Sequence, residues 1–360
     1  MEDNVLKYQC PCCNAALMFD ANSQKVKCYS CNNEYEKQVL DEYKLALEEL
    51  NQPGTIDWTE AGVQEYTDMG EQKGYFCESC GAEIVADANT SATECLYCGN
   101  PVVLPKQVTG MLQPDYIIPF KIDKEVAKNR LKDFYRGKYL LPKEFKDENR
   151  ISKIQGLYVP FWLFDCKSEG TVSYRGTRIN TWSDSKNIYT KTSFYSVMRS
   201  GNMQFERVPV DASLKMADEY MDGIEPYDYR DLRPFDSMYM AGYFADKFDV
   251  TVDDTKSRIE LRVKNSLKDA LRSNVMGYNS VTEEQSNISM NMKDVRYALM
   301  PVWVLSTRYK DQVYQFVMNG QTGKVSGKLP IDKKKMWITA LIEFFAITIV
   351  LFIIGLLILL

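Results

Sequence analysis

Ten cysteines are the residues best suited to do chemistry in this chain of 360 residues, which contains no histidine. Eight of them form four Cys-x-x-Cys pairs, arranged in two sets. Fourteen residues separate the two pairs of a set, and each cysteine of the second set lies 67 positions after its counterpart in the first. This spacing is typical of zinc ribbons, in which each pair gives two thiolates to a tetrahedral ion. The sequence therefore predicts two zinc ions, one held by Cys10, Cys13, Cys28 and Cys31 and the other by Cys77, Cys80, Cys95 and Cys98.

Redox dithiols and iron–sulfur clusters are the alternative interpretations of these cysteines. A reactive dithiol is expected at the start of a helix, and no helical pattern follows any of the pairs. The spacings also match no ferredoxin run. Because four thiolates close a zinc site to water and substrate, we expect no catalysis at the metal.

The first set leaves a choice of ligand, because Cys12 stands beside Cys13. The 67-residue register favours Cys13, which leaves Cys12 and Cys166 as spare thiols. Each pair is followed by a residue that tolerates the positive φ of a tight turn. These residues are Asn14, Asn32, Gly81 and Gly99.

Composition narrows the possible functions. Without histidine the chain cannot build an ordinary serine or cysteine triad. The run Gly320-Gln321-Thr322-Gly323-Lys324 is too short for a phosphate-binding loop, and the overlapping residues Asn319–Gly323 predict a turn. A net charge of −5 and acidic ribbons give no basic surface for nucleic acid. The run 218–236 collects seven acidic residues without calcium-loop spacing, and it predicts a solvated loop with a few aromatic anchors.

Residues 336–360 form an apolar run of 25 residues whose one ionisable group is Glu343. A helix of this length can cross a bilayer of roughly 30 Å. Three lysines at 333–335 precede it, which predicts a folded body on the cytoplasmic face of the cell membrane, joined to a single C-terminal span. The acidic, polar start of the chain predicts no signal peptide.

Glu343 shares one side of the predicted span with Thr339, Ala340 and Ala346. A stripe of small and polar residues lets transmembrane helices approach closely, so these four residues are a candidate transmembrane interface. The alternative is an interfacial glutamate that draws in water or is protonated.

The pattern of the whole chain predicts an α+β fold with antiparallel strands. We expect a first zinc ribbon at 1–36, a helical linker at 37–70, a second ribbon at 71–105, an α+β body at 106–332 and an anchor at 333–360. Helices are predicted at 37–51, at 124–136 after the capping residue Asp123, and around Ile259, Val263 and Leu267. Strand-like runs at 188–199 and 203–210 flank Ser200-Gly201-Asn202, which predicts a hairpin.

A weak internal sequence similarity indicates a duplication within the body. LYVPFWLF at 157–164 and ALMPVWVL at 298–305 share an apolar Pro-x-Trp strand. Pro160 and Pro301 favour edge strands or bulges, and Trp162 and Trp303 are expected in the core.

Four phrases resemble a known bacterial family. They are TECLYCGNPVVLPKQVTGMLQPDYIIPFKIDKEVA from Thr93, YVPFWLFD, RVPVDASLKMADEYMDGIEPYDY and NGQTGKVSGKLP, in that order. The family is that of TFIIB-type zinc-ribbon proteins, and its single-span, tail-anchored members form a YdjG-like branch. Asn14, Asn32 and the extra Cys12 depart from its usual knuckles.

The resemblance implies a part in envelope stress or membrane maintenance. Its expected partners are a phage-shock-protein-A homologue, a TPM-domain membrane protein and an SPFH-domain protein. Taken with the residues, it predicts a non-enzymatic adaptor held on the cytoplasmic face by a C-terminal helix. A nucleic-acid-binding protein working at the membrane is the alternative, followed by an enzyme that uses carboxylates.

Overall fold

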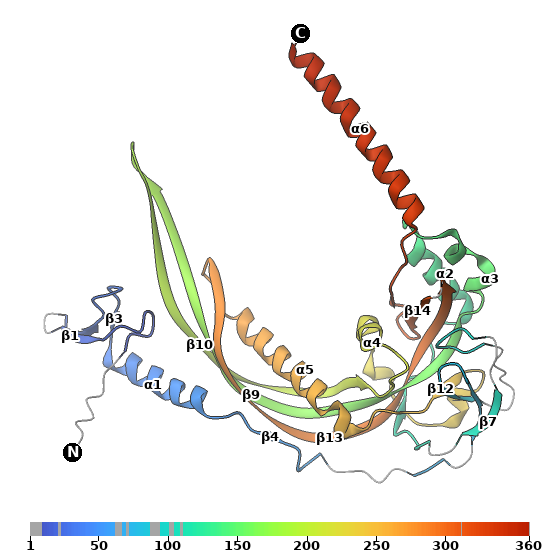
Figure 1. Ribbon diagram of the computed structural model, residues 1–360. Helices are drawn as coiled ribbons and strands as arrows, with labels where there is room; N and C mark the ends of the chain where they lie inside the picture. Colours follow the sequence, from blue (N-terminus) through green and yellow to red (C-terminus); the bar gives the residue numbers. More distant parts are fainter. Residues whose placement is uncertain are drawn as a thin grey trace. The chain divides into compact units, whose positions relative to one another are not determined.

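A computed structural model describes residues 9–20, 23–61, 67–69, 72–86, 94–100, 104–108, 111–310 and 312–359, with the backbone alone for 104–108 and 355–359. The fold is α+β, as predicted (Figure 1). The helices are α1 (Lys37–Asn51), α2 (Lys124–Tyr135), α3 (Glu148–Ile151), α4 (Asp218–Ile224), α5 (Val252–Ser273) and α6 (Lys333–Leu359), with 3-10 turns at Lys143–Lys146, Tyr229–Asp231 and Ser237–Met240.

The strands form one small sheet and one large sheet. The small sheet is antiparallel and has the order β1-β2-β3, whereas the large one has the order β11-β8-β13-β9-β12-β6-β5-β7, with β10 beside β9, β4 and β14 beside β13, and β15 beside β14. The strand bounds are β1 (Met18–Asp20), β2 (Lys25–Lys27), β3 (Glu34–Tyr35), β4 (Ile56–Asp57), β5 (Gln72–Phe76), β6 (Glu83–Ala86), β7 (Leu104–Val108), β8 (Tyr116–Ile117), β9 (Gln155–Ser183), β10 (Ile188–Asp211), β11 (Arg233–Pro234), β12 (Phe244–Asp246), β13 (Ser280–Tyr309), β14 (Gln312–Asn319) and β15 (Val325–Gly327).

The chain divides into two compact units, and β9, β10 and β13 supply residues to both. The first unit comprises Met1–Val63, Phe164–Val208 and Lys256–Val295. The second comprises Gln64–Leu163, Pro209–Thr255 and Arg296–Leu360. The domain boundaries expected from the sequence stay a prediction.

In the first unit, α5 covers the long strands with the apolar face that the sequence predicted. Ile259, Val263 and Leu267 are buried, and the Tyr174 hydroxyl on β9 donates to the Lys268 carbonyl at 3.4 Å. α1 has the predicted bounds and buries two leucines of its apolar face. A buried helical stripe is therefore the feature that the sequence specifies best here.

The hairpin predicted at residues 200–202 is wrong, because β10 runs through this region without a break. Gly201 keeps an extended backbone, and a Cβ there would lie 3.1 Å from Leu271 Cδ2 of α5. The glycine therefore permits a close approach to the helix and does not form a turn. The hairpin lies elsewhere, where Asp184 N–H donates to the Asn187 carbonyl between β9 and β10.

The second unit contains two similar halves, in agreement with the similarity between the segments 157–164 and 298–305. Residues 157–158 of β9 pair in parallel with β12, and the equivalent residues 298–299 of β13 pair in parallel with β8. Neither strand is an edge strand, contrary to the sequence-based expectation. Pro160 and Pro301 each follow these short parallel pairings by two residues, and the β14 pairing of β13 begins only at Val302. A missing N–H is tolerated where one neighbouring strand ends and another begins.

The tryptophans of the two similar segments occupy equivalent places in the core. Trp162 Nε1 donates to the Val250 carbonyl at 2.9 Å, and Trp303 Nε1 donates to the Ile122 carbonyl at 3.0 Å. Each acceptor lies two residues before the first residue of a helix, α5 or α2. Each half therefore places a tryptophan against the helix start of the other half.

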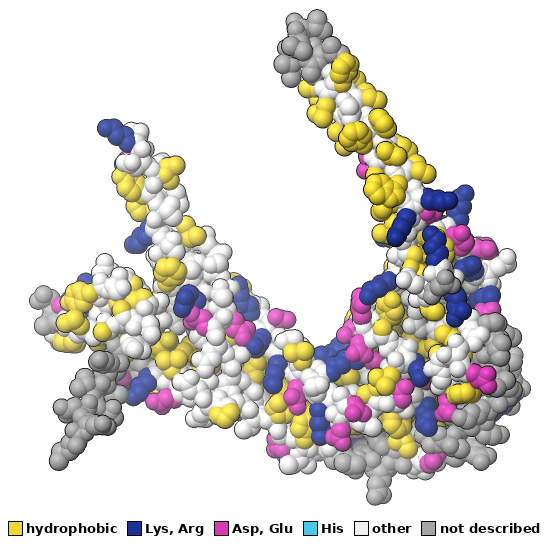
Figure 2. Space-filling view, in the orientation of Figure 1, with side chains coloured by type: hydrophobic (Ala, Val, Ile, Leu, Met, Phe, Trp, Pro, Cys, Tyr) yellow, Lys and Arg dark blue, Asp and Glu magenta, His cyan; other side chains and the backbone are white. Residues whose placement is uncertain are grey.

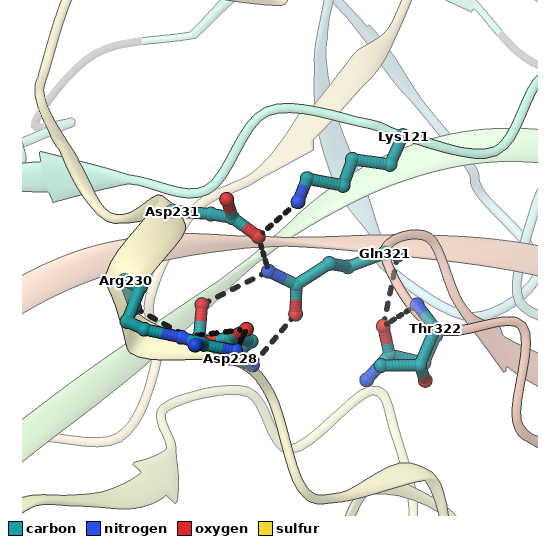
Figure 3. A network of polar contacts seen from close by, with 7 residues as sticks. Lys121, Asp228, Arg230, Asp231, Gln321 and Thr322 are labelled. Atoms are coloured by element: carbon teal, nitrogen blue, oxygen red, sulfur yellow. Dashed lines mark hydrogen bonds and ion pairs between the residues drawn. The ribbon is translucent and has the colours of Figure 1, made fainter.

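The acidic run 218–236 is not the solvated loop that its composition predicted. It contains α4, and it is fastened to the turn after β14 (Figure 3). Gln321 accepts from Asp228 N–H at 2.7 Å and donates to the Asp228 carbonyl at 2.9 Å and to the Asp231 carboxylate. Lys121 pairs with the same carboxylate at 2.5 Å. The sequence showed the charges but not the amide and lysine that they face.

Candidate metal centres

The four Cys-x-x-Cys pairs adopt one local geometry. In each pair the N–H of the residue after the second cysteine donates to the carbonyl of the first, at 2.8–2.9 Å. That residue has a positive φ in all four cases, between 58° and 70°. The residues are Asn14, Asn32, Gly81 and Gly99, as predicted.

These turns bring the predicted cysteines together in two groups of four. The sulfur atoms of Cys10, Cys13, Cys28 and Cys31 lie within 4.8 Å of one another, and so do those of Cys77, Cys80, Cys95 and Cys98. Across the two pairs of each group, Sγ–Sγ distances are 3.4 and 3.6 Å in the first group and 3.6 and 3.7 Å in the second. A tetrahedral zinc ion with Zn–S bonds of about 2.3 Å requires sulfurs about 3.8 Å apart. Both groups therefore fit such an ion, and four thiolates would fill its coordination sphere.

Cys12 lies outside the first group, and its sulfur is hydrogen-bonded to a side chain that is not one of the four cysteines. The Tyr35 hydroxyl donates to Cys12 Sγ at 3.2 Å and also lies 3.2 Å from Cys10 Sγ. Tyr35 was not predicted from the sequence. The residue 67 positions later is Val102, so the repeat carries no signal for it. Cys166, the other spare thiol, is buried on β9, where burial raises its pKa to about 11.

The first cysteine of each group has a lowered pKa. Burial alone would raise the pKa of Cys10, but the hydrogen bond with Tyr35 and hydrogen bonds from backbone N–H groups outweigh it and lower the pKa to about 7. Its counterpart Cys77 has a lowered pKa for the same backbone reason, again against burial. Burial raises the pKa values of Cys31 and Cys95. Backbone dipoles therefore favour one thiolate in each group before any cation is considered.

The first group lies in a small module with its own sheet, β1-β2-β3. Cys13 is exposed, and Met18 and Phe19 on β1 are 61% and 62% exposed. A cavity of about 300 Å³ is lined by residues of this module and of α1, among them Leu17, Val26 and Leu40. This ribbon therefore contributes little of its surface to a larger core.

The second group is built into the large sheet. β6, which follows its first cysteine pair, is antiparallel to β12, with Ile84 opposite Asp246. Cys77, Cys95 and Ile84 belong to one hydrophobic cluster with β9 and β13. Asp246 is buried there and accepts from the Ser213 hydroxyl at 2.5 Å, and burial raises the pKa of its carboxyl to about 7.

α6 is a candidate membrane span. Its segment Lys333–Ile354 has a mean hydropathy of 2.5 and is not buried by the rest of the chain (Figure 2). Asp332 begins the helix by accepting from the N–H groups of Lys334 and Lys335. Thr339 donates to the Lys335 carbonyl at 2.7 Å within the helix, while Ala340, Glu343 and Ala346 are exposed on the turns that follow. The structure thus places all four candidate interface residues along α6.

These features define an α+β protein with two four-cysteine centres and one apolar C-terminal helix that is long enough to cross a membrane. No protein-family model and no solved structure match the chain. It is 33% identical over 332 residues to the uncharacterized protein YdjG of Bacillus subtilis (strain 168). The aligned region covers 92% of each chain. The chain therefore belongs to the YdjG family.

Proposed function

We propose that the protein is a non-enzymatic adaptor anchored in the cell membrane by α6, with its body and two zinc ions on the cytoplasmic face. The observation that carries this proposal is the uncovered apolar helix joined to a folded body. The closed geometry of both cysteine groups supports it, because such centres stabilise folds and leave no open position for a reaction. The three lysines that begin α6 support the orientation.

The proposed partners are a phage-shock-protein-A homologue, a TPM-domain membrane protein and an SPFH-domain protein, in envelope stress or membrane maintenance. Membership of the TFIIB-type zinc-ribbon family is part of the same proposal, on the sequence phrases that suggested it. Purification in mild detergent followed by mass spectrometry tests it, and we expect these proteins to accompany the chain. A tight complex with DNA or RNA that weakens steeply with salt would instead favour a nucleic-acid function.

Metal analysis of the purified protein tests the zinc assignment, with two zinc ions per chain as the expected result. A chain that ends before Met336 should be soluble and keep both ions, because neither cysteine group includes residues of α6. If that shortened chain still floats with membranes, another surface binds lipid and α6 is not the sole anchor.

We also propose that the stripe of Thr339, Ala340, Glu343 and Ala346 docks a transmembrane partner. A carboxylate facing lipid is costly, whereas a polar group on a neighbouring helix would satisfy it. Glu343→Leu should keep the chain in the membrane and weaken recovery of the co-purifying membrane protein. Ile338→Leu is the matched control, an apolar change on the side of the same helix away from the stripe. Unchanged recovery with Glu343→Leu, and with leucine at both alanines, would make the helix an anchor only.

A further inference from the structure

The far end of the β9–β10 hairpin extends beyond its neighbouring strand (Figure 1). β13 begins at Ser280, whose hydroxyl lies 2.5 Å from Thr177 Oγ1 on β9. Past this contact, all residues from 178 to 192 are exposed, on both faces of the two strands. A two-stranded ribbon without a covered face is marginally stable in water.

Several large apolar side chains are exposed on this ribbon. Trp182 and Tyr189 stack next to the turn, with ring centroids 5.7 Å apart and planes 15° apart. Their exposed fractions are 53% and 41%, and Ile188 beside them is 78% exposed. Ile179 and Phe194 add 47% and 44% further down the ribbon. An aromatic pair and an isoleucine at the tip together form an exposed apolar patch of the kind that marks an interaction site.

The charge of the same segment is basic, although the whole chain is acidic. Residues 178–192 contain Arg178, Lys186 and Lys191 and a single acidic residue, Asp184. The Asp184 carboxylate is used within the turn, where it accepts from two backbone N–H groups and from the Tyr189 hydroxyl at 2.7–3.0 Å. In the described parts of the chain, no carboxylate forms an ion pair with Lys186 or Lys191. Figure 2 shows basic and hydrophobic side chains together along this projection.

We propose that the tip of the β9–β10 hairpin is a second membrane contact, which docks on an anionic lipid surface. Tryptophan and tyrosine favour the bilayer interface, where an apolar ring and a polar tip are both satisfied. Lysines beside them are attracted to anionic headgroups. The proposal rests on the anchoring by α6, because a tethered chain meets the bilayer at a high effective concentration and a weak contact then suffices.

Quenching of tryptophan by brominated acyl chains tests this contact in the full chain. Trp337→Phe removes the tryptophan of α6, which leaves Trp182 as the exposed one, since Trp162 and Trp303 are 2% and 4% exposed and Trp58 is partly buried. In vesicles of phosphatidylcholine and phosphatidylglycerol we expect brominated lipid to remove most of the Trp182 emission. Trp182→Phe in this background should abolish the quenchable component, whereas Trp58→Phe should leave it unchanged.

The basic residues provide an independent readout. Lys186→Gln with Lys191→Gln, or vesicles of phosphatidylcholine alone, should reduce the quenching by about twofold or more. Equal quenching with and without Trp182 overturns the proposal. A second result also overturns the proposal. If Trp182 is shielded from a water-soluble quencher in native membranes but not in vesicles, it contacts a protein partner and not lipid. Flotation with vesicles tests the α6 anchor separately. If the chain floats but Trp182 is not quenched, the hairpin contact is wrong and the anchor stands. If the chain does not float, both the hairpin contact and the α6 anchor are wrong.

Discussion

The two cysteine centres share their local geometry and differ in what surrounds them. The first lies in a separate three-stranded sheet whose apolar residues Met18 and Phe19 face outward. The second contributes Cys77 and Cys95 to the hydrophobic cluster of the large sheet. The same motif can therefore serve as a small module of its own or as part of a larger core. Loss of the metal should have different consequences in the two places.

Removing one ligand from each centre should show the largest difference. Cys95→Ser should lower the melting temperature of the chain by about 10 °C or more, because structural zinc supplies about 10 kcal/mol or more of apparent folding free energy and this centre is part of the core. Cys28→Ser changes the equivalent ligand of the first centre and should leave the main transition in place. Both variants should contain one zinc ion, measured by metal analysis beside calorimetry. Equal losses of stability would mean that the first ribbon also supports the large core.

The sequence predicted the two cysteine motifs but not which strands and helices surround each of them. The 67-residue repeat predicted which cysteines form each group. This was possible because each Cys-x-x-Cys pair is positioned by a local turn and not by distant parts of the chain. That β6 joins β12, far along the chain, could not be read from the cysteines, since their spacing is the same in both ribbons. The failed hairpin at Gly201 has a similar cause: a glycine that admits α5 resembles one that makes a turn until the helix is placed.

Cys12 and Cys13 allow a sharper test within the first centre. Cys13→Ser should remove one zinc ion, because its sulfur belongs to the four-cysteine group. Cys12→Ser should retain two, because Cys12 Sγ accepts from Tyr35 and lies outside the group. Titration with a chromophoric chelator measures both. Retention of two ions by Cys13→Ser would show that Cys12 can replace its neighbour.

Asp246 should give the second unit a pH dependence that the first ribbon lacks. Burial raises the pKa of Asp246 from 3.8 to about 7, with Asp249 adding to the effect. The folded state thus holds the proton more tightly than the unfolded state. The resulting stabilisation is complete below the unfolded pKa and is lost as pH rises through about 7.

Asp246→Asn keeps an oxygen that can accept from Ser213 and removes this titration. Its melting temperature relative to wild type should therefore rise between pH 6 and pH 8, whereas the effect of zinc thiolates is common to both proteins. Among the described residues of the first ribbon no carboxylate is buried, so no equivalent variant exists there. Parallel curves for variant and wild type would show that Asp246 stays protonated throughout this range or is never protonated in it.

The smallest expected effect comes from exchanging the turn residues that distinguish the two ribbons. Asn14 and Gly81 occupy equivalent turns, with φ of 62° and 70°. Glycine adopts this conformation without strain, whereas asparagine is tolerated at a modest cost. Asn14→Gly should therefore slow the release of zinc from the first centre, and Gly81→Asn should speed release from the second, each by an amount equivalent to about 1 kcal/mol or less. A Cβ at Gly81 would meet no atom within 4 Å, so the exchange tests φ alone and not packing. Release rates measured with the same chelator check both changes. If both exchanges leave the rates unchanged, the turn residue does not set the difference between the centres, and their surroundings alone account for it.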